Sequence, residues 1–179
     1  VLKLAEKLSK KSLKRTHVFV LFNAEEMGLL GATYFVDTWS RYEPTYGKLV
    51  GMLNFDMVGR FDKDLGVQGV GTALEWSSVL TSLQPQMSVV HKKQSVGSSD
   101  HASFIRKKIP ALFFTTGAHE DYHKSSDTAE KINYPQLDKL LVYSQDILKK
   151  IDAENKITFD PKYSQDDGQG SSRGYGAHL

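Results

Sequence analysis

Short continuous apolar runs alternate along this chain with segments whose apolar residues recur at helical spacing. The first run, 18–22, contains only Val, Phe and Leu, a composition typical of a central strand covered on both faces. Further strands are predicted at 48–55, 65–70, 87–91 and 109–115. Strands that alternate with helices favour an α/β fold with a mostly parallel, mixed sheet and helices on both faces.

The clearest helix is predicted at 135–153, where apolar residues follow the 3.6-residue period and Pro135 suits the first turn. Helical spacing also predicts helices at 1–12, 28–42, 72–83 and 99–107. Beyond Phe159 the composition changes to Asp, Gln, Gly and Ser, which is typical of a linker. The chain opens at Val1 directly in an amphipathic pattern, so we expect it to be a fragment of a longer protein.

Composition excludes several classes of function. No apolar run approaches the roughly 20 residues needed to cross a bilayer. The formal charge is +2, and the basic clusters 10–15 and 106–108 are short and lack interleaved aromatic residues, so no nucleic-acid partner is predicted. The chain has no cysteine, so a bound metal would have to be held by histidines and carboxylates.

Acidic and imidazole side chains follow three of the predicted strands. Glu25 and Glu26 follow the run 18–22, Asp56 follows 49–55, and the loop 117–123 with two histidines follows 109–115. Because ligands bind beyond the carboxyl ends of strands in open α/β sheets, we expect these side chains to converge in one cleft. An acidic pair can also simply lie at the start of a helix, where carboxylates stabilise the helix dipole. A loop histidine is often only a hydrogen-bond partner. Three such strand ends with complementary donors favour a metal site.

Five segments resemble, in the same order, motifs of the M28 metallopeptidases, a family of zinc aminopeptidases and related enzymes. The matching residues are Phe22–Gly31 (FNAEEMGLLG), Asn54–Gly59 (NFDMVG), Ser99–His101 with Phe104, Ile109–Ala111, and Asp121–His123 with Asp127 and Thr128. The resemblance extends through most of the chain.

The resemblance implies a role for each of five residues. Glu25 would be the general base that takes a proton from the attacking water, and Tyr122 would donate a hydrogen bond to the tetrahedral oxyanion. Glu26 and His123 would bind one zinc ion and Asp56 the other. The implied cofactor is Zn²⁺, two per complete site, and the implied substrate is a peptide.

Other polar residues in the motifs have two readings. Asp100 and His101 either support the metal-binding pocket or merely lie in the first turn of a short helix that is capped by Ser98 or Ser99. Asp127 would cap or orient the loop of His123. His119 is read as a neighbour of the site.

The chain departs from the family pattern upstream of Glu25. A His-x-Asp element and a further Asp that bridges both zinc ions are absent, and His17 would lie at the wrong end of its strand. Residues 1–158 are therefore expected to form the carboxy-terminal part of a zinc peptidase catalytic domain. This part would be incomplete at its N-terminus, inactive alone, and left with an uncovered strand edge or face. Residues 159–179 would be a linker, leading to a further, PDZ-like domain.

The leading functional hypothesis is a zinc-dependent exopeptidase, an aminopeptidase that hydrolyses N-terminal peptide bonds. One alternative on the same fold is a glutaminyl cyclase-like acyltransferase, which works with one zinc ion. The other is a non-catalytic, peptidase-like binding module. Loss of ligands is the usual mark of such modules, whereas Glu25, Glu26, Asp56, Tyr122 and His123 are all present here.

Overall fold

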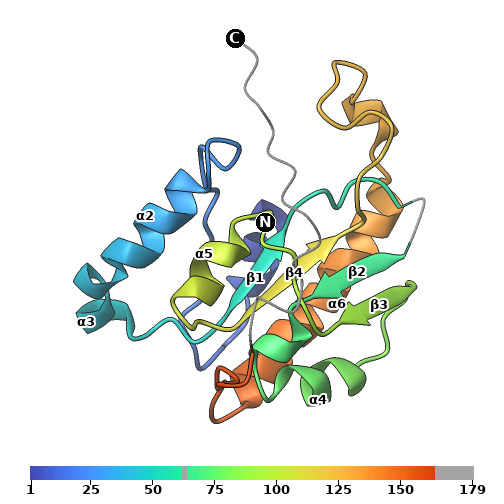
Figure 1. Cartoon of the computed structure of the whole chain (residues 1–179). Coiled ribbons are helices and arrows are strands. Elements are labelled where there is room, and N and C mark those ends of the chain that lie inside the picture. Colours follow the sequence, from blue (N-terminus) through green and yellow to red (C-terminus); the bar gives the residue numbers. More distant parts are fainter. Residues whose placement is uncertain (62–63, 164–179) are drawn as a thin grey trace.

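The computed structural model describes residues 1–61 and 64–163, which form a four-stranded sheet packed against helices (Figure 1). The strands are β1 (Met52–Phe55), β2 (Leu65–Gln68), β3 (Val89–Lys92) and β4 (Ala111–Thr115), in the order β1-β4-β2-β3. β1 pairs with β4 and β2 with β3 in parallel, whereas β2 and β4 are antiparallel. The predicted α/β fold with a mostly parallel, mixed sheet is confirmed.

Helices form at the five predicted places, with shorter bounds at four of them, and a further short helix forms at 43–46. They are α1 (Leu2–Leu8), α2 (Leu30–Thr38), α3 (Glu43–Tyr46), α4 (Trp76–Thr81), α5 (His101–Arg106) and α6 (Tyr134–Ala153), with 3₁₀ turns at Trp39–Arg41, Val70–Thr72 and Ala129–Lys131. The start of α6 is well defined, because the Asn133 side chain accepts a hydrogen bond from the backbone N–H of Gln136 and Pro135 lies in the first turn.

The central strand β4 is buried on both faces, and its alternating side chains divide the core in two. Leu112 and Phe114 belong to a cluster with α4 and α6, and α6 passes behind the sheet in Figure 1. Ala111 belongs to the opposite cluster with α2 and α5. Residue 113 packs on that second side too, because the Phe113 ring stacks on His101 of α5 with centroids 4.4 Å apart. The period of two thus fixes which side of the sheet each helix covers.

The prediction of a central strand at 18–22 is wrong. These residues form no strand, and Val18, Phe19 and Leu21 are 48%, 37% and 70% exposed. A continuous apolar run becomes a buried strand only when other elements cover both of its faces, and within the described residues nothing covers the outer side of this run. Glu25 and Glu26 therefore follow an extended segment and not a strand end.

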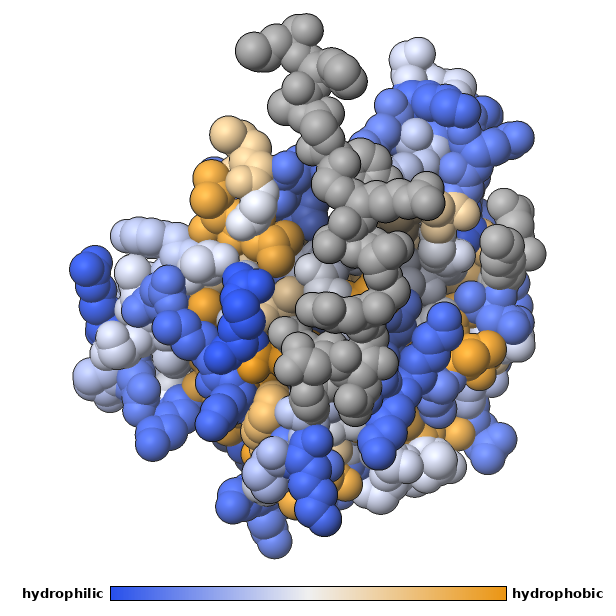
Figure 2. Space-filling view, in the orientation of Figure 1, coloured by the Kyte–Doolittle hydropathy of each residue, from blue (hydrophilic) through white to orange (hydrophobic). Residues whose placement is uncertain are grey.

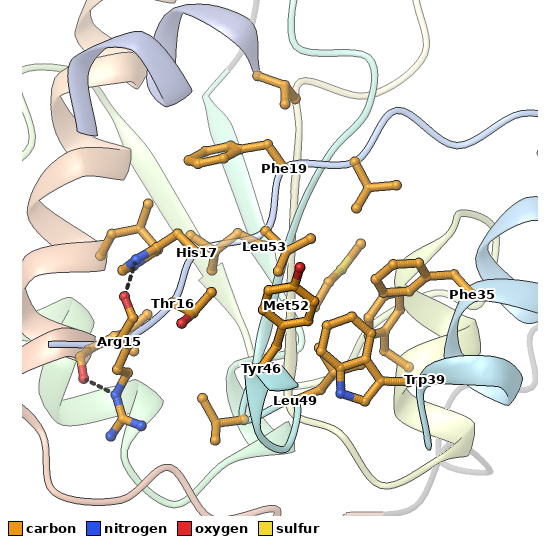
Figure 3. A pocket seen from close by; sticks show the side chains of 18 of the residues that line it. Arg15, Thr16, His17, Phe19, Phe35, Trp39, Tyr46, Leu49, Met52 and Leu53 are labelled. Carbon is orange, nitrogen blue, oxygen red and sulfur yellow. Dashed lines mark hydrogen bonds between the residues drawn. The ribbon is translucent and has the colours of Figure 1, made fainter. Parts of the chain in front are cut away.

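An apolar groove of about 200 Å³ lies between this segment and β1 (Figure 3). Phe35 and Trp39 lie on one side of it, with His17 and Phe19 on the other. β1 is the first strand of the sheet, so its outer edge has no strand partner among the described residues. Because every open sheet has two unpaired edges, the expectation that upstream strands are missing stays a prediction.

The surface carries further exposed apolar side chains close to the acidic pair. Met27 is 74% exposed and Leu30 is 52% exposed. On the face drawn in Figure 2, apolar residues form separate patches among hydrophilic ones. In the described part of the chain, no helix has the length and apolarity to cross a membrane.

The last described residues contact segments that follow β2 and β3. Phe159 forms an isolated antiparallel bridge with Ala73, and the Tyr163 hydroxyl accepts a hydrogen bond from the backbone N–H of Ser95 at 3.2 Å. Residues 164–179, which make up most of the predicted linker, lie outside the described residues.

A buried polar network connects β1 to the start of α5. The Asn54 Nδ2 donates to Ser99 Oγ at 2.8 Å and lies 3.3 Å from His101 Nδ1. On the other side of the ring, His101 Nε2 lies 2.8 Å from the Val96 carbonyl oxygen, which can only accept, so Nε2 carries the proton. His101 is fully buried, and this burial lowers its pKa to about 4, which keeps the imidazole neutral.

Lowering the pH is expected to destabilise the fold through His101. The unfolded chain protonates this ring near the ordinary pKa of 6.5, whereas the folded state does so only near 4. The unfolded state takes up the proton first, so the stabilisation is complete above pH 6.5 and is lost as the pH falls towards 4. We expect a loss of roughly 3 kcal/mol in the free energy of unfolding across this window. Urea unfolding of the wild type and of His101→Gln over the same pH range measures it.

The His101→Gln variant has no titrating ring, so its stability should fall less steeply over that window. His17→Gln, in the extended N-terminal segment, is the matched control and should follow the wild type. Parallel curves for the wild type and His101→Gln would contradict the assignment.

Candidate active site

The carboxylate of Glu26 and the imidazole of His123 meet directly, although 97 residues separate them in the chain. Glu26 Oε1 lies 2.7 Å from His123 Nε2, and both side chains are more than half exposed. The His123 ring stacks on the neighbouring Tyr122 ring with centroids 3.8 Å apart. One oxygen atom and one nitrogen atom that can each bind a metal ion therefore meet at the surface.

A tight turn over residues 23–31 presents Glu25 and Glu26. The Glu25 carbonyl accepts hydrogen bonds from the backbone N–H groups of Gly28 and Leu29, at 3.0 and 2.8 Å. A Cβ at Gly31 would lie 2.5 Å from the Asn23 carbonyl oxygen, so only glycine allows this close approach. The turn depends on its glycines and places both carboxylates just before α2.

Glu25 lies in the field of several other carboxylates. Burial raises its pKa above the ordinary 4.5, and repulsion from Asp56, then Glu26, then Asp100 raises it further, while His123 acts in the opposite direction. Burial, followed by repulsion from Asp56, also raises the pKa of Asp100. A cluster of like charges of this kind disfavours ionisation of its members and favours binding of a cation.

Asp56 directly follows β1, at the end of the sheet where the parallel strand β4 also ends. Its backbone N–H donates to the Phe114 carbonyl at 3.2 Å, which continues the β1–β4 ladder by one residue. The next residue, Met57, has a left-handed φ of 55°. Its carbonyl accepts two hydrogen bonds from Thr116, from the N–H at 3.0 Å and from the hydroxyl at 2.6 Å. The chain after Asp56 is thus attached to the chain after β4.

Left-handed backbone recurs at the residues that surround the site. Ala24 (φ 53°), Met57 (φ 55°) and His123 (φ 57°) are all non-glycine residues in this region. Such conformations persist only where the surroundings enforce them, and they are common at functional sites.

The loop after β4 is held by a group of charges. Arg60 Nη2 donates to Asp121 Oδ2 at 2.9 Å and to Asp127 Oδ1 at 2.6 Å. Asp121 is buried, and hydrogen bonds from Lys131, Ser126 and Arg60 hold its pKa well below its usual range. His119 also belongs to this group, with Nε2 3.8 Å from Asp127 Oδ2 and a buried Nδ1 that has no hydrogen-bond partner among the described residues.

The donors present match the chemistry of zinc in part. Carboxylate oxygen and imidazole nitrogen are ligands that Zn²⁺ prefers. Among residues 1–61 and 64–163, however, no group of three or more such side chains is placed to hold a metal ion. The described residues can therefore supply two converging donors, Glu26 and His123, with Asp56 close by.

Contacts and electrostatic interactions connect the five predicted site residues to one another. Glu26 contacts His123, Tyr122 stacks on His123, and Glu25 lies within electrostatic range of Asp56, Glu26 and His123. Asp100 joins this group, whereas His101 lies buried in the network with Asn54. Sequence reasoning missed Arg60 because both of its partners are more than 60 residues away in the chain.

Known proteins resemble this chain over most of its length. Peptidase family M28 matches residues 1–145. Leucine aminopeptidase 2 from Trichophyton rubrum is 26% identical over 164 residues, covering 74% of this chain and 33% of the relative. Leupeptin-inactivating enzyme 1 from Streptomyces exfoliatus is 32% identical over 135 residues, covering 73% of this chain and 30% of the relative.

A solved zinc aminopeptidase from Bacillus subtilis shares the fold, with a TM-score of 0.68 and 26% identity over 89% of this chain and 42% of that one. The chain spans about a third of the length of the curated relatives it matches. Because the family match extends over most of its residues, this chain belongs to peptidase family M28.

Proposed function

We propose that this chain is the part of a zinc-dependent aminopeptidase that carries the general base and one side of a dinuclear zinc site. The observation that carries the proposal is the 2.7 Å contact between Glu26 and His123. A carboxylate and an imidazole from distant parts of the chain meet there, beside the ends of β1 and β4. Membership of a peptidase family indicates that the reaction at this site is peptide hydrolysis.

Each of the five residues has a role in this proposal. Glu26 and His123 hold one zinc ion, and Asp56 contributes to the second. When bound, two zinc ions polarise the scissile carbonyl and lower the pKa of a water molecule. The remaining ligands come from residues other than these five.

Glu25 is the general base. Its carboxylate, presented beside Glu26 by the turn over residues 23–31, takes a proton from water and passes it to the leaving amine. Tyr122 donates its phenolic hydrogen bond to the oxyanion of the tetrahedral intermediate. Its stacking on His123 keeps the phenol beside that imidazole.

The substrate in this proposal is a peptide with an apolar N-terminal residue. Its basis is the leucine aminopeptidases among the relatives. Leucyl-p-nitroanilide is therefore the first probe to test.

Glu25→Gln and Glu26→Ala should have different effects in the full-length protein. Glu25→Gln keeps the shape of the side chain but cannot accept the proton, so turnover should fall by a factor of at least ~100 while zinc content stays nearly unchanged. Glu26→Ala removes a ligand and should lower zinc content. Turnover of the probe and zinc by atomic absorption measure both effects.

Glu120→Gln is the matched control, because Glu120 is an exposed carboxylate on the same loop as His123. It should leave both quantities unchanged. Equal loss of zinc in Glu25→Gln and Glu26→Ala would refute the division of labour between the two residues.

The 179-residue chain produced alone should neither hydrolyse the probe nor hold two zinc ions tightly. Two cations sit close together only when carboxylates neutralise their repulsion, and the described residues contain no group of three donors. Zinc titration of this chain beside the full-length protein tests the expectation. Two tightly bound ions together with peptidase activity in the short chain would overturn it.

A further inference from the structure

We propose that Arg60 is a positioning residue that fixes the loop of His123 relative to the loop of Asp56. It does so by holding two carboxylates of the His123 loop, Asp121 and Asp127, with one guanidinium. The inference rests on the proposed function for the roles of Asp56 and His123. Its geometry stands on the contacts of the cluster itself.

Arg60 bridges two segments that are far apart in the chain. It lies four residues after Asp56, and its Nη2 reaches Asp121 at 2.9 Å and Asp127 at 2.6 Å. The Arg60 side chain is only 15% exposed and that of Asp121 only 7%, so both charges are largely removed from water. Without Arg60, Asp121 would keep its ion pair with Lys131 at 2.7 Å, but its Oδ2 would lose its donor and the loop would lose its link to the chain after β1.

Asp121 has no free carboxylate oxygen. Oδ2 accepts from Arg60, and Oδ1 accepts from Ser126 Oγ and from Lys131 Nζ, each at 2.7 Å. Ser126 and Lys131 belong to the loop itself and Arg60 to the chain after β1, which indicates that the carboxylate holds the loop together and attaches it to that chain. Charge-assisted hydrogen bonds are the strongest class in proteins and give the loop a defined position.

Two backbone hydrogen bonds attach the same two segments just before Arg60. Thr116 donates to the Met57 carbonyl, and the Asn133 N–H donates to the Gly59 carbonyl at 2.9 Å. The chain from 57 to 60 is therefore joined to both ends of the loop 117–132. Arg60 supplies the contact to the middle of that loop, where neither backbone attachment reaches.

The contact is passed on to His123 through a tight turn. The Asp121 carbonyl accepts from the Lys124 N–H at 2.9 Å, which closes a turn around Tyr122 and His123. His123 occupies a left-handed φ of 57° in this turn. A side chain held in that way keeps its direction only while the first residue of the turn is fixed, and Arg60 fixes it.

Metal affinity depends on such support. Groups that orient a ligand typically change metal affinity 10–100-fold when they are removed. Arg60 carries a positive charge, so an effect through charge alone would run in the opposite direction, because its removal would favour a cation. The sign of the change therefore separates positioning from electrostatics.

The experiment compares Arg60→Met, Arg60→Lys and Asp121→Asn in the full-length protein. Competition with a chromophoric chelator measures the affinity for Zn²⁺. Arg60→Met and Asp121→Asn should weaken it by about 10–100-fold. Arg60→Lys keeps the charge but not the planar guanidinium, so its loss should be smaller than that of Arg60→Met. Lys107→Met is the control, because it breaks an exposed ion pair of 2.7 Å with Asp37, away from the loop.

A second measurement needs no metal. Hydrogen exchange of the amides of residues 118–128 in the zinc-free protein should be faster in Arg60→Met and Asp121→Asn than in the wild type, and unchanged in Lys107→Met. Circular dichroism selects a temperature at which every variant is folded. Arg60→Lys should show intermediate exchange, so the comparison holds even where Arg60→Met folds poorly.

The outcomes separate this inference from the proposed function. Glu26→Ala and His123→Ala report on the zinc site itself. If both lose zinc while Arg60→Met keeps wild-type affinity and exchange, the positioning role is refuted and the proposed site stands. If both keep zinc, the proposed site fails, and the exchange of the loop still decides whether Arg60 holds it.

Discussion

The parallel pairing of β1 with β4 is the constraint on which the site depends. Because Met52 pairs with Ala111 and Phe55 with Phe114, the carboxyl ends of both strands lie side by side. The chain after β1 carries Asp56, and the chain after β4 leads to His123. Without this shared register the two segments would lack the Met57 and Gly59 hydrogen bonds that attach one to the other. The remaining features, including the Arg60 cluster, act on a geometry that this pairing has already set.

Much of the fold could be predicted because the relevant information is local. The strand at 111–115 is a short continuous apolar run, the helix at 134–153 shows the 3.6-residue period, and Pro135 suits the first turn of that helix. The run 18–22 shows where local information ends. Its composition predicts a strand, but whether a strand forms depends on neighbours that supply backbone partners and cover its faces. The antiparallel pairing of β2 with β4 was likewise not encoded in any one segment.

Some residues of the candidate site could likewise be predicted from the sequence, and others could not. Carboxylates and histidines that follow apolar runs are visible in the sequence, and the motif resemblance singles out five of them. Their supporting residues are not visible, because Arg60 is an ordinary loop arginine until the fold brings Asp121 and Asp127 to it. His101 gave an ambiguous signal for a different reason. Its burial, stacking on Phe113 and contact with Asn54 arise from three separate elements, which no spacing rule connects.

The left-handed residues around the site have a consequence for amino-acid substitutions at these positions. Ala24, Met57 and His123 each hold a conformation that costs a non-glycine residue about 1 kcal/mol or more. Glycine would relieve that cost at Ala24 and Met57, but it would also allow the chain on either side of Glu25 and Asp56 to move. Substitution by glycine at these two positions would therefore exchange backbone strain for mobility beside the two carboxylates.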